Sequence, residues 1–204
     1  EWSRTKGLAN SRPAELMTAG RDGDPFDVDS GLPVAELKQR NSLSFVEFAQ
    51  SYMDMKWPDA AAKTRTSTVD ALATAGTVFV LPATGRPEAT DLRRVLMSTL
   101  LPPRTRDNEV SPEDREVVAW IVRQSRPLYD LTDAVTMRDV LDALATKLDG
   151  KSAAATVYRR KRAVLFNLLS YAVERELLPD NPMTKVKRTA PKIVEEVDPR
   201  VVAN

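Results

Sequence analysis

The 204-residue chain contains no cysteine and no histidine. Without cysteine it can form neither a disulfide framework nor a thiolate metal site. Without histidine it lacks the Ser-His-Asp triad, imidazole metal ligands and histidine acid–base chemistry. It has no glycine-rich phosphate-binding loop, and the carboxylates gathered in residues 107–116 are explained by a helix start. We therefore expect no catalytic residues, no metal and no cofactor in this chain.

Long apolar runs are also missing. No stretch of about 18 apolar residues is present, and the N-terminus lacks the charged and then apolar layout of a signal peptide. Together with the missing cysteine, these features predict a cytoplasmic protein without a membrane span. The chain starts at Glu1 rather than Met and stops at Asn204 without a terminal signal, so we expect a piece of a longer protein.

The distribution of charge is the most informative feature that is present. The formal net charge is only +1. Residues 151–192, however, hold ten basic and three acidic residues, a net of +7, whereas the rest holds 20 basic and 26 acidic residues, a net of −6. A basic third in a nearly neutral chain predicts a surface that binds a polyanion such as DNA. The alternative is a solvated surface on which charges happen to cluster.

Apolar residues recur at helical spacing, and no convincing alternating run indicates a strand, so the sequence predicts an all-α protein. A short helix is also expected at residues 10–19, within an irregular N-terminal lead-in. The main helices are expected at residues 43–56, 59–75, 91–101, 112–124, 136–148 and 152–177.

Local signals predict where these helices begin and end. Ser44 and Glu47 have the spacing of a capping box, and Ser111 precedes a proline at the first helical position. Thr136 is the expected N-cap of the fifth helix. Gly76 and Gly150 are the expected stops of the second and fifth helices.

The helix expected at 152–177 has two different faces when its residues are placed at steps of about 100°. Lys161 and Arg162 fall within or beside the apolar arc, and we expect their stems to cover the core while their charged ends reach solvent. Tyr171 is expected in the core. The apolar arc holds Val157, Val164, Leu165, Leu168, Leu169 and Ala172, with Tyr158 at its edge. The opposite arc holds Thr156, Arg159, Arg160, Ala163, Asn167 and Ser170.

Several segments, taken in order, resemble the tyrosine-type site-specific recombinases, also called the phage integrase family, and are most similar to actinobacterial members. The strongest are residues 149–164 (DGKSAAATVYRRKRAV), 170–174 (SYAVE) and 177–182 (LLPDNP). Residues 52–58 (YMDMKWP) and 60–65 (AAAKTR) resemble the first two helices of the core-binding domain of that family. Residues 26–33 resemble its lead-in, and residues 197–204 resemble the entry to its catalytic domain.

The resemblance implies a helical bundle of the core-binding (SAM-like) type, which forms half of a C-shaped clamp on DNA. Residues 1–41 would then be a lead-in, 42–184 the core-binding domain with an insertion around 80–128, and 185–204 an extended linker to a catalytic domain. The family's catalytic residues lie in that second domain, so none is assigned here. The implied partner is the double-stranded core site, with self-association of the full-length recombinase on DNA.

The residues expected to contact DNA combine this resemblance with the basic helix starts, where free backbone N–H groups favour phosphate. They are Lys63, Arg65 and Thr66, then Lys151, Ser152, Thr156, Arg159 and Arg160, and in the linker Lys185, Lys187 and Arg188.

Three hypotheses remain open from the sequence. The first is the DNA-binding part of an integrase that acts in DNA integration and recombination. The second is a stand-alone helical DNA-binding adaptor or regulator. The third is a helical bundle that uses its basic face to bind acidic proteins.

Overall fold

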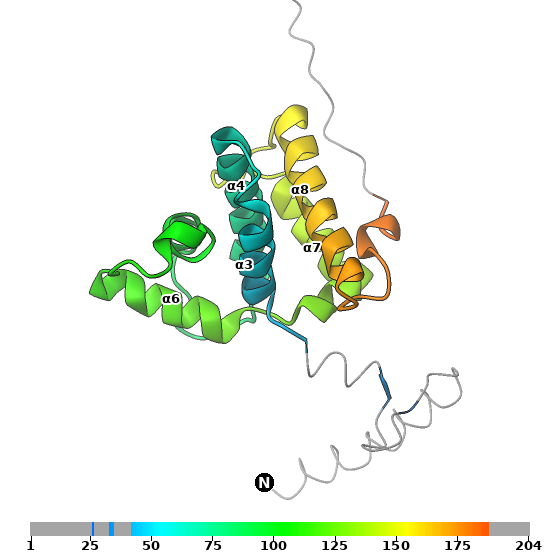
Figure 1. Cartoon of the computed structure of the whole chain (residues 1–204), viewed down its shortest axis with the longest axis horizontal. Helices are drawn as coiled ribbons and strands as arrows, with labels where there is room; N and C mark the ends of the chain where they lie inside the picture. The colour runs from blue at the N-terminus through cyan, green and yellow to red at the C-terminus, as the bar shows by residue number, and fades with distance from the viewer. Residues whose placement is uncertain (1–25, 27–32, 35–41, 188–204) are drawn as a thin grey trace, which may run out of the picture. The chain divides into compact units, whose positions relative to one another are not determined.

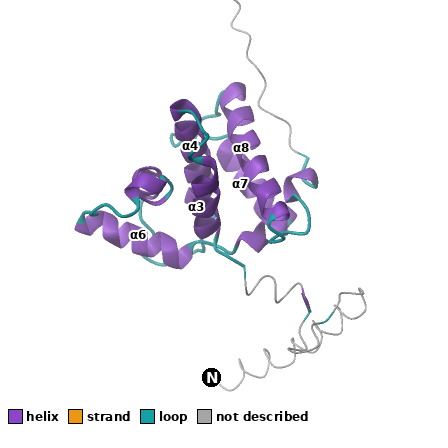
Figure 2. Cartoon of the chain, in the orientation of Figure 1, coloured by secondary structure: helices purple, strands orange, loops and turns teal. Residues whose placement is uncertain are grey.

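A computed structural model describes Phe26, residues 33–34 and residues 42–187. The chain divides into two units, residues 1–42 and 43–204. In the first unit, Phe26 and Pro33 form an isolated antiparallel bridge. The short helix expected at 10–19 lies outside the described residues, as do most of the expected lead-in and linker. In the described part of the second unit, all regular structure is helical apart from isolated bridges, which confirms the all-α class (Figures 1 and 2).

The capping box at the start of the first helix is confirmed. Helix α3 (Phe45–Lys56) begins after Ser44, whose hydroxyl accepts a hydrogen bond from the Glu47 backbone N–H at 3.2 Å. The Glu47 carboxylate accepts from the Ser44 N–H at 2.9 Å. The helix ends at Trp57, which precedes a proline and so disfavours further helix.

Helix α4 (Ala62–Val78) is the centre of the bundle (Figure 1). Four helices pack against it, namely α3, α5 (Ala89–Val95), α7 (Ala134–Leu144) and α8 (Ala155–Glu174). Its buried side is rich in alanine, threonine and glycine, which allows these neighbours to approach closely. The Thr68 and Thr77 hydroxyls donate to carbonyls one turn back in the same helix, at 2.9 and 2.7 Å. These contacts satisfy polar groups that burial would otherwise leave unpaired.

The predicted helix stop at Gly76 is wrong, because α4 continues through it to Val78. Gly76 is buried, and a Cβ at this position would lie 3.2 Å from Leu96 Cδ1 and 3.5 Å from Phe45 Cε1. The glycine is therefore explained by close packing against two neighbours. A local stop signal is weak, and tertiary packing overrides it here.

The third predicted helix changes its hydrogen-bond pattern part-way. Helix α5 (Ala89–Val95) continues into a π-helical turn, η1 (Leu96–Leu100), which the Leu101 N–H closes on the Leu96 carbonyl at 3.0 Å. Leu92, Leu96 and Leu101 are fully buried. Residues 80–128, expected to be an insertion, therefore supply part of the same hydrophobic core as α3, α4, α7 and α8.

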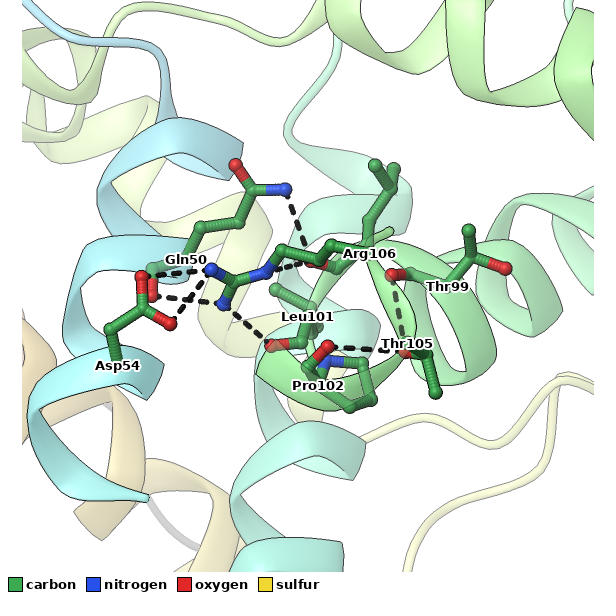
Figure 3. A network of polar contacts seen from close by, with 8 residues as sticks. Gln50, Asp54, Thr99, Leu101, Pro102, Thr105 and Arg106 are labelled. Carbon is green, nitrogen blue, oxygen red and sulfur yellow. Dashed lines mark hydrogen bonds and ion pairs between the residues drawn. The ribbon is translucent and has the colours of Figure 1, made fainter. Parts of the chain in front are cut away.

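Arg106 fastens the chain after this π-helical turn to α3 (Figure 3). Its Nη1 donates to both carboxylate oxygens of Asp54, at 2.7 and 2.8 Å. Its other nitrogens donate to the backbone carbonyls of Gln50, Leu100 and Leu101 at 3.0–3.1 Å. One guanidinium thus joins α3 to the end of the π-helical turn, where the carbonyls of Leu100 and Leu101 accept its hydrogen bonds. A short 3₁₀ turn, η2 (Pro103–Thr105), leads into it.

Helix α6 (Pro112–Gln124) has the predicted bounds and the predicted cap, because the Ser111 hydroxyl accepts from the Asp114 N–H at 3.1 Å. It lies at the side of the bundle away from α8 (Figure 1). After it, the backbone returns beside the start of α3, where Phe45 N–H donates to the Arg126 carbonyl at 2.9 Å. A 3₁₀ turn, η3 (Leu128–Thr132), then leads to α7.

The predicted bounds of the fifth helix, 136–148, are wrong at both ends. Helix α7 (Ala134–Leu144) begins after Asp133, whose carboxylate accepts from the Thr136 N–H at 2.8 Å. This hydrogen bond holds the pKa of the Asp133 carboxyl below its ordinary value. Thr136 and Asp139 have the spacing of a helix cap, but the Thr136 backbone N–H is the donor to the cap. The capping residue is therefore Asp133, three positions before Thr136.

The C-terminal error arises from a return turn. Backbone hydrogen bonds from Lys147 N–H to the Lys151 carbonyl and from Ala153 N–H to the Ala145 carbonyl, both 2.8 Å, turn the chain back beside the end of α7. Gly150, with φ of 78°, lies inside this turn and does not end the helix. Leu148 was predicted to face inward but is 60% exposed.

Helix α8 (Ala155–Glu174) starts three residues later and ends three residues earlier than predicted. A left-handed residue, Glu176, follows it, and Leu177 N–H donates back to the Ala172 carbonyl at 2.9 Å. The 3₁₀ turn η4 (Pro182–Thr184) then packs on α7. Val186, in the segment expected to be linker, is buried in the core.

The buried position of Leu92 generates a stability prediction for residues 80–128. We expect Leu92→Ala to lower the free energy of unfolding by about 2–5 kcal/mol, since it removes a core side chain and leaves a cavity. Val122→Ala, at a 55% exposed position of α6, should change it by less than about 0.5 kcal/mol. Urea unfolding followed by circular dichroism measures both. Equal, small effects would show that residues 80–128 fold apart from the core.

Candidate nucleic-acid interface

The outer face of α8 presents a group of exposed side chains that includes two arginines. The expected outer arc is confirmed as exposed for all of its members except Ser170, which is half-buried. On the other side, Val157 and Val164 are half-buried, and Tyr158, expected at the edge, is buried. The exposed members are Thr156, Arg159, Arg160, Ala163 and Asn167. The fully buried members of the apolar arc are Leu165, Leu168, Leu169 and Ala172.

Arg159 and Arg160 are not neutralised by a neighbouring carboxylate. Among the residues that the structure describes, neither forms an ion pair. The first turn of α8 carries no acid, and Glu174 at its far end is the only acid in the helix. The positive charge of this face is therefore available to an anionic partner, which is the main electrostatic requirement for binding DNA.

Lys161 behaves differently from its neighbours, and the prediction that its charged end reaches solvent is wrong. The residue is only 9% exposed, and its Nζ lies 3.3 Å from Asp70 Oδ2 and 2.8 Å from the Thr74 hydroxyl of α4. Arg93 of α5 pairs with the same carboxylate. The ammonium therefore pairs with side chains of α4 instead of reaching solvent. Arg162 is half-buried.

The pKa values at this junction show the competition between burial and pairing. Burial lowers the pKa of the Lys161 ammonium, although the nearby Asp70 carboxylate opposes the change. Burial alone would raise the pKa of Asp70, but hydrogen bonds and charges from Arg93 and Lys161 outweigh it and hold the pKa below its ordinary value. Asp70 is therefore ionised at neutral pH and joins α4, α5 and α8.

The predicted DNA contacts at the start of α8 are only partly placed there. Lys151 and Ser152 precede the helix and lie in the return turn after α7, so the prediction that they begin α8 is wrong. Lys151 is exposed, and its Nζ lies 3.8 Å from Asp149 Oδ2. Thr156 does lie in the first turn. The N-cap is Ala154, which provides no side-chain hydrogen bond, so the first-turn N–H groups of α8 receive no side-chain cap.

The start of α4 repeats this pattern. Its N-cap, Ala61, also provides no side-chain hydrogen bond, and its first turn carries no acid. Lys63 and Thr66 are exposed, and the Thr66 hydroxyl donates to the Ala62 carbonyl at 3.1 Å. Helix starts of this kind favour an anion because their N–H groups and the helix dipole both point toward it.

Arg65 belongs to the loop between α3 and α4 more than to the surface. Its Nε donates to the Trp57 carbonyl at 2.9 Å and its Nη2 to the Pro58 carbonyl at 3.4 Å. The guanidinium also lies over the Trp57 ring, 5.1 Å from its centroid. These contacts commit the side chain to closing the loop, so it has little freedom to reach a phosphate.

The remaining predicted contacts follow η4. Lys185 pairs with Asp180 at 2.7 Å, which partly neutralises it, whereas Lys187 is exposed. Arg188 lies outside the described residues. The chain just before η4 is joined to α8, because Asn181 Nδ2 donates to the Ser170 hydroxyl at 2.9 Å and to the Phe166 carbonyl at 3.0 Å.

Sequence reasoning missed the partners of Lys161, namely Asp70 and Thr74, and it missed Arg93, which pairs with the same Asp70 carboxylate. A lysine in the apolar arc of a long helix was a usable signal, because a buried ammonium requires an acid nearby. The identity of that acid could not be read, because Asp70 lies far away in the chain.

Comparisons with models of known protein families, with curated proteins and with solved structures found no match to this chain. The resemblance to tyrosine-type recombinases therefore stays a prediction. Within residues 42–187, no helix has the length and apolar character needed to cross a bilayer. The same described residues contain no group of three acidic side chains placed to hold a metal ion.

The different placements of Arg65 and Lys63 predict different effects of substitution. We expect Arg65→Ala to lower the free energy of unfolding by about 1–2 kcal/mol, since it removes hydrogen bonds and a cation–π contact. Lys63→Ala, two residues away and exposed, should change it by less than about 0.5 kcal/mol. Thermal and urea unfolding of both variants provide the measurement. Equal stability of the two variants would contradict the role of Arg65 in closing the loop.

The lowered pKa of Asp70 predicts an acid-dependent loss of stability. A carboxyl with a depressed folded-state pKa stabilises the fold above its unfolded value, about 3.9, and loses this effect as pH falls through the folded value. Asp70→Asn should therefore be less stable than the wild type by about 1.5–3 kcal/mol at pH 7. The difference should shrink steadily below about pH 4.

Urea unfolding between pH 7 and pH 2.5 tests this, with Asp139→Asn on the exposed side of α7 as the control for the change in net charge. A constant difference across the whole pH range would mean that Asp70 acts through its shape and not through its charge.

Proposed function

We propose that this chain binds double-stranded DNA through the outer face of α8, with the starts of α4 and α8 as additional phosphate contacts. One observation carries the proposal. Arg159 and Arg160 are exposed on one face of the helix and form no ion pair in the described part of the chain. The next residue, Lys161, instead pairs with Asp70 of α4. The two arginines thus remain free for an external anion.

The shape of this face suits a DNA groove. An α-helix fits the major groove, and arginines that flank it contact phosphates and release counterions. Ala163 has a small side chain that allows close approach. Asn167, on the same face, carries a donor and an acceptor that can pair with the edge of an adenine. Phosphate contacts would then position the helix and Asn167 would read sequence.

We further propose that the chain is the core-binding, non-catalytic part of a tyrosine-type site-specific recombinase. The all-α bundle and the exposed basic face of its long helix support this role. The parent enzyme would break and rejoin DNA strands through a phosphotyrosine in another domain, and self-association would occur on DNA. The tyrosines in the described residues, Tyr52, Tyr129, Tyr158 and Tyr171, are buried or half-buried in the bundle and are not proposed as nucleophiles.

The alternatives are a stand-alone DNA-binding regulator and a bundle that binds acidic proteins. A catalytic domain in the reading frame beyond Asn204 would distinguish the recombinase from the regulator. An acidic protein partner would be distinguished by the absence of DNA binding.

The salt dependence of DNA binding tests the interface directly. If about four phosphates are contacted, the logarithm of the association constant should fall with the logarithm of salt concentration at a slope of about −3.6. We expect Arg159→Ala with Arg160→Ala to weaken binding and to reduce the magnitude of the slope by about 2, since each phosphate contact contributes about 1. Fluorescence anisotropy with a labelled duplex provides both values.

The matched control is Arg123→Ala with Arg138→Ala, which removes the same charge from exposed positions on α6 and α7. It should leave the affinity within about twofold of wild type at moderate salt, since charges beyond a Debye length are screened. Unfolding curves of the α8 double variant should match the wild type. A flat salt response would reject the DNA-binding face, and an unfolded double variant would show that the arginines are structural.

A further inference from the structure

A cavity of about 440 Å³ lies between α4, α5, the end of α7 and the early part of α8. Four cationic side chains line it, Arg86, Arg93, Lys147 and Lys161, and no carboxylate is among the described residues of its lining. The hydroxyl-bearing side chains of Thr74, Thr77 and Thr146 also line it. None of the residues proposed to contact DNA is part of this lining, so the cavity is separate from the outer face of α8.

The positive charge around the cavity is only partly balanced. Asp70 lies behind the wall, and two of the four cations, Arg93 and Lys161, share this single carboxylate. Arg86 and Lys147 form no ion pair with the described residues. Four cations against one carboxylate leave an excess of three positive charges in a partly enclosed space.

The Thr74 hydroxyl cannot form a further hydrogen bond with a ligand, because all of its hydrogen-bonding positions are occupied. Thr74 Oγ1 donates to the Asp70 carbonyl at 2.8 Å and accepts from Arg93 at 2.7 Å and Lys161 at 2.8 Å. A hydroxyl has one donor and two acceptor positions, so none remains. Contacts with the described residues use two of the three N–H donors of Lys161. The third is available to a ligand in the cavity.

An anion in the cavity would compensate part of the cost of burying Lys161. Burial lowers the pKa of Lys161, which means that the folded protein does not fully compensate the ammonium for its lost hydration. Arg86 is held in place at the other side by a hydrogen bond from its Nη2 to the Thr77 carbonyl at 2.9 Å. Its guanidinium is thus positioned before any ligand binds, which reduces the entropy lost on binding.

We propose that this cavity binds a small organic molecule that carries a phosphate group. Clustered guanidinium and ammonium groups favour a phosphate dianion, because its charge matches the local excess better than a single carboxylate would. The volume falls in the range of about 300–1,000 Å³ that is usual for small-molecule sites. Val78, 41% exposed, and Leu148, 60% exposed, supply apolar contacts for the organic part of the ligand.

The ligand would contact α4, α5 and α8 at the place where Asp70 already joins them. The site goes beyond the proposed DNA binding and does not depend on it. A phosphate of the DNA backbone has the same chemistry as a phosphorylated small molecule, so the test must distinguish these two sources.

Isothermal titration calorimetry on the whole chain, at constant ionic strength, tests the site with pyrophosphate and adenosine monophosphate as probes. We expect saturable binding of at least one probe. Lys147→Ala with Arg86→Ala should weaken it by at least about tenfold, since each substitution removes a hydrogen bond to a charged group. Arg159→Ala with Arg160→Ala removes the same charge outside the cavity and should change the affinity by less than about twofold.

A circular dichroism melt of each ligand-free variant verifies its fold. If Arg86→Ala unfolds the protein, Lys147→Ala alone provides a second variant. It alters an exposed side chain that forms no ion pair in the described residues. Absence of saturable binding of both probes at concentrations up to about 10 mM would overturn the proposal. Equal weakening by the two double variants would also overturn it, because binding would then reflect general charge. If the cavity variant instead weakens duplex binding as much as the α8 variant does and neither probe binds, the phosphate belongs to DNA and the small-molecule site is rejected.

Discussion

The ion pair between Lys161 of α8 and Asp70 of α4 is the interaction on which the arrangement of the basic helix depends. Together with the buried leucines of α8, it sets the rotation of this helix about its own axis, because Lys161 points toward α4. Successive residues of a helix are separated by about 100°, so the preceding two arginines are turned outward. A lysine that would otherwise add to the surface charge instead orients the two arginines that remain there.

The same carboxylate connects this junction to α5, because Arg93 pairs with it as well. Residues 80–128 therefore support the bundle through Leu92 and Leu96 in the core and through Arg106, which pairs with Asp54 of α3. The small residues of α4 make this possible, because they let four helices approach one axis. At Gly76 the neighbouring helix lies so close that even a methyl group would press on Leu96.

Charge has two separate uses in the proposed functions. On the outer face of α8 it is exposed and unpaired in the described residues, which suits a long, screened polyanion such as DNA. In the cavity it is partly enclosed and partly paired with Asp70, which suits a compact anion that replaces lost hydration. Lys161 lies on the boundary between the two uses, since it lines the cavity and positions the arginines beside it.

The sequence by itself determined the features that depend on neighbours within about one helical turn. These include the all-α class, the capping box of Ser44 and Glu47, the cap at Ser111 and the two faces of α8. The start of α7 was misplaced because Asp133 and Thr136 both offered a cap signal, and its end was misplaced because the chain forms a return turn around Gly150. Only the tertiary structure decided that Gly76 is a packing residue, that Arg65 closes a loop and that Lys161 is paired. Each of these depends on atoms brought close by folding, as the 87-residue separation of Lys161 and Thr74 shows, and no local pattern records such a partner.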